Sequence, residues 1–267
     1  MSISALYDGI LRDQRRAAFR HAGLVGVVVA SCLVSLWITG FFDAERLIDG
    51  LPALGQLFSE MVPPDFSRWR SWVRPLVDTL AMSIAGTALA VALSLPLALL
   101  AASNTSPNAL VYQVCRVILS GLRSVPELIM GIIFVAAVGF GALPGVLALA
   151  LHSVGMVAKF YGEAIEHVDP KPLEAARAAG ASGFQVITHA VLPQVLPQLA
   201  DITIYRWEYH FRASTVLGIV GAGGIGFELI AALRIIKYDQ VSAILLTILA
   251  CVIVVDALGA WLRRQLK

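Results

Sequence analysis

Long apolar runs that are almost free of charge constrain this chain more than any other feature of its sequence. Residues 22–42 contain no charged side chain, and residues 75–102 contain only Asp78. Of all residues, 14% are charged, whereas soluble domains carry about 25%. A helix needs about 20 apolar residues to cross the hydrocarbon core, and it satisfies its own backbone there. We therefore expect an all-α integral membrane protein.

The other apolar segments bring the expected number of membrane-spanning helices to about six. The proline-containing breaks "RSVPE" and "GALPG" separate two middle spans from each other and from an amphipathic helix at 110–123. The last span ends in "WLRRQLK", where Trp261 and two arginines suit a membrane interface. The expected spans are 22–42, 75–102, 126–140, 144–160, 195–213 and 241–260.

The basic N-terminal segment, residues 1–21, has two interpretations. Four arginines before an apolar run are typical of a secretory signal, and "VASC" resembles a lipoprotein cleavage box. However, the apolar run continues for ten residues past Cys32, which is longer than the apolar part of a signal. An uncleaved first span at 22–42 is the favoured interpretation.

The distribution of lysine and arginine predicts the orientation. With six spans and a cytoplasmic N-terminus, the inner segments hold twelve of these residues and the outer segments six. Both termini, residues 1–21 and 263–267, are then cytoplasmic. Residues 43–74 form an external loop, with Trp69 and Trp72 at the membrane interface, and the spans from 75 to 262 form the core domain.

The residues that usually carry chemistry are scattered. Three cysteines and five histidines show no metal-ligand spacing, and no G-x-x-x-x-G-K-[ST] loop occurs. We expect no catalytic site, no metal site and no bound nucleotide in this chain, and no nucleic-acid partner.

The polar stretch at 162–193 predicts two short helices on the cytoplasmic side. Prolines at 170 and 172 suit the start of a helix over 173–179, and Gly180 suits its end. "ASGFQVITHAV" predicts a second helix with Phe184, Ile187 and Val191 on one face, and Pro193 then breaks the chain. The stretch is either a solvated connector or a docking element.

A resemblance favours the docking element. "EAARAAGASGFQVITHAVLP" resembles the EAA loop of ABC-importer permeases, with Ala190 where isoleucine is usual. The matching positions are Glu174, Ala175, Ala176, Gly180, Leu192 and Pro193. In that family the loop seats in the ATPase subunit and couples ATP-driven closure to the spans.

The resemblance covers residues 75–265 and implies a type I importer architecture with cytoplasmic coupling helices. It also implies the partners: two ATPase subunits that bind ATP and Mg²⁺, an external substrate-binding protein, and a second permease copy, which we expect to be this same chain. The chain itself is then a transport subunit and not an enzyme, in the inner membrane.

The span at 195–213 carries an unusual number of charges. At 100° per residue, Asp201, Glu208 and Arg212 share one side, and Arg206 and His210 the other. Glu208 and Arg212 are expected to pair at i, i+4, whereas Arg206 needs a partner on another helix or a bound anion. Two interpretations stay open: interhelical ion pairs, or a path for an anionic substrate lined by these side chains.

The cargo is indicated by a second resemblance. "YRWEYHFRASTVLGIVGAGGIG" and "RSVPELIMGIIFVAAVGFGALPGVLAL", which includes Pro126 and Glu127, resemble the permeases of phosphonate and phosphite importers. The implied cargo is a small phosphorus oxyanion, which guanidinium groups bind well. His210 stands where that subfamily often has a neutral polar residue. The alternative cargo is an amino acid such as methionine.

"GAGGIG" at 221–226 fits the G-x-G-x-x-G pattern of dinucleotide-binding loops. Such a loop needs alternating strands and helices around it, and its neighbours here are apolar spans. We expect instead a flexible, closely packed break near the dimer pathway, a hinge or gate formed by Gly221, Gly223, Gly224 and Gly226.

Overall fold

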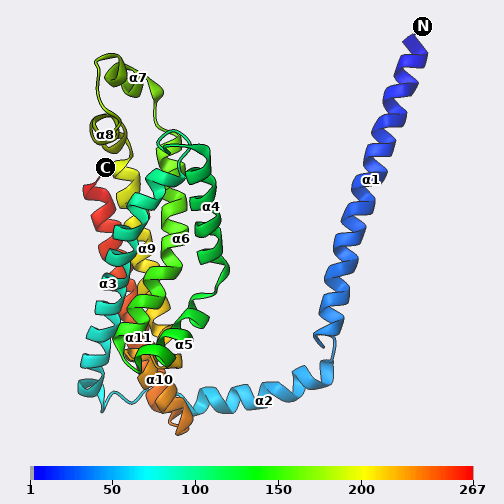
Figure 1. Ribbon diagram of the computed structural model, residues 1–267. Coiled ribbons are helices and arrows are strands. Elements are labelled where there is room, and N and C mark those ends of the chain that lie inside the picture. Colours follow the sequence, from blue (N-terminus) through cyan, green and yellow to red (C-terminus); the bar gives the residue numbers. More distant parts are fainter. Residues whose placement is uncertain (1–2, 267) are drawn as a thin grey trace. The chain divides into compact units, whose positions relative to one another are not determined.

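The computed structural model describes residues 3–266, and each regular element in that range is a helix. Met1, Ser2 and Lys267, at the outer ends of the predicted segments 1–21 and 263–267, lie outside the described residues. The chain forms two compact units, Met1–Glu60 and Met61–Lys267, drawn in Figure 1.

The first unit contains α1 (Ile3–Ile38) and α2 (Ala44–Glu60). Residues Ala18–Ile38 of α1 are long and apolar enough to cross a membrane. The side chains of this stretch are exposed along its length, which suits contact with lipid. The expected external loop at 43–74 is largely helical, because α2 and the start of the next helix fill most of it.

The second unit is a bundle of long helices with short helices at its two ends (Figure 1). Its elements are α3 (Trp69–Ala101), α4 (Ala109–Ser124), α5 (Glu127–Val138), α6 (Ala142–Glu166), α7 (Pro170–Ala178), α8 (Gly183–Val186), the π-helix η1 (Ile187–Val191), α9 (Leu192–Leu217), the 3₁₀ helix η2 (Gly218–Val220), α10 (Ile225–Arg234) and α11 (Tyr238–Gln265). We call the end that carries α7, α8 and the C-terminus the loop end; α10 lies at the opposite end (Figure 1).

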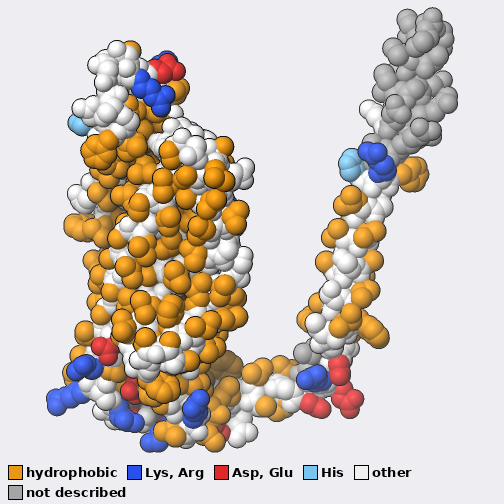
Figure 2. Space-filling model, in the orientation of Figure 1, with side chains coloured by type: hydrophobic (Ala, Val, Ile, Leu, Met, Phe, Trp, Pro, Cys, Tyr) orange, Lys and Arg blue, Asp and Glu red, His pale blue; other side chains and the backbone are white. Residues whose placement is uncertain are grey.

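Small side chains bring the central helices together. A Cβ atom at Gly86 of α3 would lie 3.0 Å from Leu149 Cβ of α6, and Ala90, Ala148 and Ala158 are fully buried. Lipid gives no hydrophobic drive to helix association, so such close backbone approach carries the packing. The face of this unit shown in Figure 2 is largely hydrophobic along the helices, and charged side chains gather at its two ends.

The count of spans depends on two bent pairs. Four helices are long and apolar enough to cross a membrane, and the described residues give up to six spans if each bent pair is counted as one. One pair is α4 with α5, bent by 84°; the other joins residues 183–220 to α10, bent by 43°.

The separate span expected at 126–140 is therefore wrong. Helix α5 has 12 residues, about 18 Å at 1.5 Å per residue, which is shorter than the roughly 30 Å core. The break before it is held by His152, whose Nδ1 lies 3.0 Å from the carbonyl oxygen of Val125.

The start of the core also differs from expectation. Helix α3 begins at Trp69 and not at 75, which turns Trp72 inward. Trp72 is 2% exposed and packs with Ile225 and Val241, so its expected place at the interface is wrong, whereas Trp69 is exposed.

Candidate functional site

The helix of the polar loop, α7, is defined at both ends. The Asp169 carboxylate accepts from the backbone N–H of Lys171 at 3.0 Å, and prolines occupy the first turn. At the other end, Gly180 has φ +83°, and the N–H of Ala181 donates to the carbonyl of Ala176 at 3.0 Å. This is a Schellman-type end, which favours glycine. The predicted helix and its stop at Gly180 are confirmed.

The second helix does not stop at Pro193. Ser182 and Gln185 form a capping box at its start, and α8, η1 and α9 then run on without a break. The π-turn closes with a hydrogen bond from the N–H of Leu192 to the carbonyl of Ile187, and Pro193 follows this turn directly in α9.

The π-turn also changes which residues share a face. Phe184 is 75% exposed, whereas Val191 is 1% exposed, so the expected common face is wrong. A π-turn adds one residue to the local period and rotates the side chains that precede it. As a result, Phe184 points away from the bundle.

Most of the residues that match the EAA pattern are accessible. Glu174, Ala175, Gly180 and Pro193 are exposed, and Ala176 and Leu192 are half-buried. The loop is anchored on its inner side by Leu173, which is buried among residues of the bundle.

A hydrogen bond ties this loop to α9. The N–H of Asp169 donates to Gln194 Oε1 at 3.0 Å, and Gln194 Nε2 donates to the carbonyl of Ala190 at 2.6 Å. These two hydrogen bonds connect the residue that precedes α7 to the first turn of α9.

One face of α9 is paired with α11. Arg212 Nη1 lies 2.9 Å from Asp256 Oδ1, and Glu208 Oε1 lies 2.8 Å from Arg263 Nη1. The expected pairing of Glu208 with Arg212 is wrong, because each has a partner across the helix interface. Asp201 also approaches Arg263, at 3.9 Å.

A glycine makes room for the buried carboxylate. A Cβ atom at Gly259 of α11 would lie 1.8 Å from Glu208 Oε1, so only glycine leaves space for this group. Glu208 is 6% exposed as a residue, and its ion pair offsets the cost of burying the charge.

The opposite face of α9 holds Arg206, which is 4% exposed. Its Nε and Nη2 donate to Ser153 Oγ at 3.0 and 2.9 Å, and its Cζ lies 4.2 Å from the centre of the Tyr209 ring. Its Nη1 lies 3.2 Å from Met156 Sδ. Among the described residues Arg206 has no carboxylate partner, so this buried cation is held by neutral groups alone.

His210 is fully buried and bonded through both ring nitrogens. Ser153 Oγ accepts from Arg206 and so donates its own proton to His210 Nε2, 2.5 Å away. Nδ1 then carries the ring proton and donates to Thr87 Oγ1 at 2.7 Å, and Thr87 donates to the carbonyl of Ser83 at 2.6 Å. This assignment makes His210 a neutral side chain that holds Ser153 under Arg206.

The bend between α4 and α5 reaches the same cluster. Pro126 precedes α5, and Glu127 begins it. The Tyr209 hydroxyl donates to Glu127 Oε1 at 2.9 Å, and Glu127 Oε2 is buried and finds no hydrogen-bond partner among the described residues. Tyr209 thus lies between the Arg206 guanidinium and the Glu127 carboxylate, which form no direct ion pair with each other. We call these residues the buried cluster: Arg206, Ser153, His210, Tyr209 and Glu127.

The glycine segment forms a closely packed turn. Gly221, Gly223 and Gly224 have φ of +98°, +75° and +72°, a region that favours glycine. A Cβ atom at Gly226 would lie 1.8 Å from the carbonyl oxygen of Thr215.

The turn is bound to its surroundings as well as closely packed. The N–H of Ile225 donates to Thr79 Oγ1 of α3 at 2.9 Å. Helices flank the turn on both sides, so it lacks the strand-to-helix surroundings of a dinucleotide-binding loop.

Several partners of the charged side chains on α9 were not predicted from the sequence. Ser153 and Thr87 stand in apolar runs that give no signal of their own. Asp256, Gly259 and Arg263 did carry a signal, because their i, i+3, i+7 spacing places them on one face of an apolar helix.

Comparison with protein families finds one match over most of the core unit. Residues 94–267 match the family described as "Binding-protein-dependent transport system inner membrane component".

Two named relatives match almost the whole chain. It is 64% identical to the phosphite transport system permease protein PtxC of Stutzerimonas stutzeri, over 97% of this chain and 94% of that protein. It is 37% identical to the phosphate-import permease protein PhnE of Mycolicibacterium smegmatis, over 98% of this chain and 49% of that protein.

Among solved structures, the fold is similar to that of an inward-facing MetNI methionine ABC transporter. The TM-score is 0.65 at 22% identity, over 73% of this chain and 96% of that chain. At this identity the likeness concerns the fold alone.

Proposed function

Since the chain belongs to the family of binding-protein-dependent transport system inner membrane components, we propose that it is the permease of an ATP-driven importer of a small phosphorus oxyanion. Phosphite, a phosphonate or a phosphate-like anion fits this class. The observation that carries the proposal is Arg206, a buried cation in a membrane-spanning helix that forms no ion pair with any of the described residues.

Arg206 has the chemistry that such a cargo needs. A charge at membrane depth is costly and usually serves a pathway or a paired site. Guanidinium binds tetrahedral oxyanions through two parallel N–H donors, and Ser153 and the Tyr209 ring already fix its orientation. The relatives that transport phosphite and phosphate support the same cargo class.

The loop end has the chemistry of a coupling element. Two cytoplasmic ATPase subunits, which bind ATP and Mg²⁺, would seat α7 and α8, with Glu174 and Gly180 in the contact. ATP-driven closure would move Asp169 and, through Gln194, the start of α9. Because α9 carries Arg206, this motion would open the buried cluster alternately to the two sides, with the glycine turn after α9 as the hinge or gate.

The remaining partners follow from the same scheme. An external binding protein delivers the anion, and a second copy of this chain completes the pathway. The C-terminus lies at the loop end (Figure 1), which supports a cytoplasmic C-terminus. With six spans, the N-terminus is cytoplasmic as well.

The alternative cargo is an amino acid such as methionine. Its carboxylate would pair with Arg206, and its ammonium would need an acceptor such as the unused oxygen of Glu127. The relatives that carry phosphite and phosphate favour the oxyanion.

Substitution of Arg206 tests the proposal. Arg206→Met keeps the apolar stem and removes the cation, and Arg206→Lys keeps the charge without the bidentate fork. Loss of a charge-assisted hydrogen bond costs about 1.5–3 kcal/mol, so phosphite uptake should fall by about 10- to 100-fold in Arg206→Met and less in Arg206→Lys. Arg234→Met, an exposed site on α10, is the matched control. Normal uptake by an assembled Arg206→Met complex would refute the role.

A further inference from the structure

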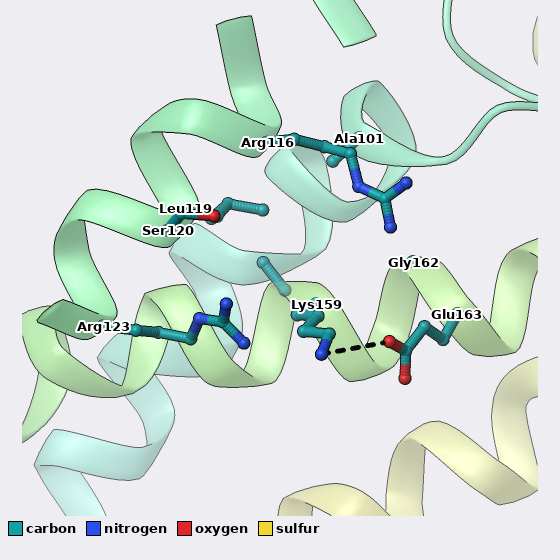
Figure 3. A pocket seen from close by; sticks show the side chains of 9 residues that line it. Ala101, Arg116, Leu119, Ser120, Arg123, Lys159, Gly162 and Glu163 are labelled. Carbon is teal, nitrogen blue, oxygen red and sulfur yellow. Dashed lines mark ion pairs between the residues drawn. The ribbon is translucent and has the colours of Figure 1, made fainter. Parts of the chain in front are cut away.

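A basic pocket opens between α4 and α6 (Figure 3). Its cavity has a volume of about 210 Å³. Arg116 and Arg123 reach it from α4, and Lys159 and Glu163 from α6. The floor is made of small residues, Ala101, Ala158 and Gly162.

The pocket holds more positive charge than its own residues neutralise. Lys159 Nζ lies 3.4 Å from Glu163 Oε1, the ion pair drawn in Figure 3. The Arg116 guanidinium lies 5.0 Å from the centre of the Tyr112 ring and donates to the Tyr112 hydroxyl. Neither Arg116 nor Arg123 has an ion-pair partner among the residues that the structure describes.

Arg123 is the most constrained of the three cations. Its Nε is buried and has no hydrogen-bond partner in the part of the chain that the structure describes. A Cβ atom at Gly155 of α6 would lie 2.7 Å from Arg123 Cγ and 2.7 Å from the carbonyl oxygen of Leu119. The close approach of α4 to α6 at this glycine fixes the Arg123 stem and directs its guanidinium toward Lys159 (Figure 3).

The converging cations repel one another, and an anion in the cavity relieves this repulsion. Charges near a low-dielectric wall interact far more strongly than in water. Two guanidinium groups and one ammonium offer forked and single donors, the set that binds a tetrahedral oxyanion.

We propose that this pocket is a second anion site, separate from Arg206, that binds a phosphorus oxyanion. Lys159 follows Ser153 by six residues on α6, which places the pocket about 9 Å from the buried cluster toward the loop end. The anion is either the free cargo as it leaves the permease or the phosphate of an anionic lipid. The assignment to free cargo rests on the proposed function.

Protection against an arginine reagent tests the site residue by residue. The complex of this chain with its ATPase subunits is placed in nanodiscs of phosphatidylcholine and treated with phenylglyoxal. Peptide mass spectrometry then gives the modification rate of each arginine. Inorganic phosphite should slow modification of Arg116 and Arg123 several-fold against chloride at equal ionic strength, and Arg234 on α10 is the internal control.

The lipid arm separates the two sources. If the ligand is a lipid phosphate, phosphatidylglycerol in the nanodisc slows modification of Arg116 and Arg123 and free phosphite does not. Either form of protection supports the site. Equal rates with phosphite, with phosphatidylglycerol and with neither would overturn it.

A gain-of-binding variant guards against nonspecific effects. Glu163→Gln removes the carboxylate that competes for Lys159, so the concentration of the protecting anion that gives half protection should fall several-fold. An unchanged or higher concentration would contradict the proposal. The protection experiment does not depend on Arg206. Absence of phosphite uptake by the unmodified complex would therefore refute the proposed function, and normal uptake by Arg206→Met would refute the role of Arg206, but neither result would remove this site.

Discussion

Gly180 and Gly183 offer a matched pair of substitutions in the loop that joins α7 to α8. A Cβ atom at either position meets no atom within 4 Å, so steric overlap does not distinguish them. The two positions differ in backbone conformation. Gly180 has φ +83°, whereas Gly183 is the first residue of α8 and has no such strain. The same change to alanine therefore isolates the backbone requirement of the loop.

The expected magnitude follows from this difference. An L-residue in the left-handed region costs about 1–2 kcal/mol, and alanine in place of a helical glycine gains about 0.5–1 kcal/mol. If the loop must keep its Schellman end to seat in the ATPase, Gly180→Ala lowers the docked population by about 5- to 30-fold. A β-branched residue, as in Gly180→Val, should lower it further. Gly183→Ala should leave it unchanged or slightly raised.

The assay is the ATPase rate of the reconstituted complex with and without loaded binding protein, beside uptake. We expect Gly180→Ala and Gly180→Val to lose stimulation of the ATPase while the permease still inserts into the membrane. Full stimulation with Gly180→Val would refute the coupling role of this turn. An equal loss with Gly183→Ala would show that the backbone strain is not the cause.

Two further substitutions test the packing of α9. Gly226→Ala places a Cβ atom 1.8 Å from the Thr215 carbonyl oxygen. Overpacking of this kind costs about 1–3 kcal/mol, so the midpoint of thermal unfolding in detergent should fall by several degrees. An unchanged midpoint would contradict the close packing of the turn. Gly259→Ala displaces the Glu208 carboxylate, which lies 1.8 Å from the position of the new Cβ atom, and separates it from Arg263. The unfolding midpoint should fall by a similar amount. The double variant Gly259→Ala, Glu208→Ala should recover part of the lost stability. Gly121→Ala on the exposed face of α4 is the control for both, since its Cβ meets no atom within 4 Å.

The sequence predicted those features that local chemistry decides. Charge-free apolar runs place the spans because lipid cannot solvate the backbone. Pro170 and Gly180 set the ends of α7 because one lacks an N–H and the other adopts a positive φ. The helical period also predicted the two faces of α9 correctly, since Arg206 and His210 lie opposite Glu208 and Arg212.

The remaining features depend on packing between distant segments. Glu208 and Arg212 do not pair with each other at i, i+4, because each forms an ion pair with an opposite charge on α11. The break between α4 and α5 falls at the predicted break "RSVPE", but hydropathy alone extended the following apolar run to a full span, whereas α5 ends at Val138. The pocket of Arg116, Arg123 and Lys159 depends on small residues that bring α4 onto α6, which no single segment reveals.

The central claim is that this permease moves a phosphorus oxyanion past Arg206. It is tested most directly in proteoliposomes that contain the permease and its ATPase, with the binding protein outside and ATP inside. Phosphite and methionine are offered together, and both are measured in the lumen. We expect ATP-dependent accumulation of phosphite alone, lost in Arg206→Met; accumulation of methionine without phosphite, or phosphite uptake that Arg206→Met leaves unchanged, would contradict it.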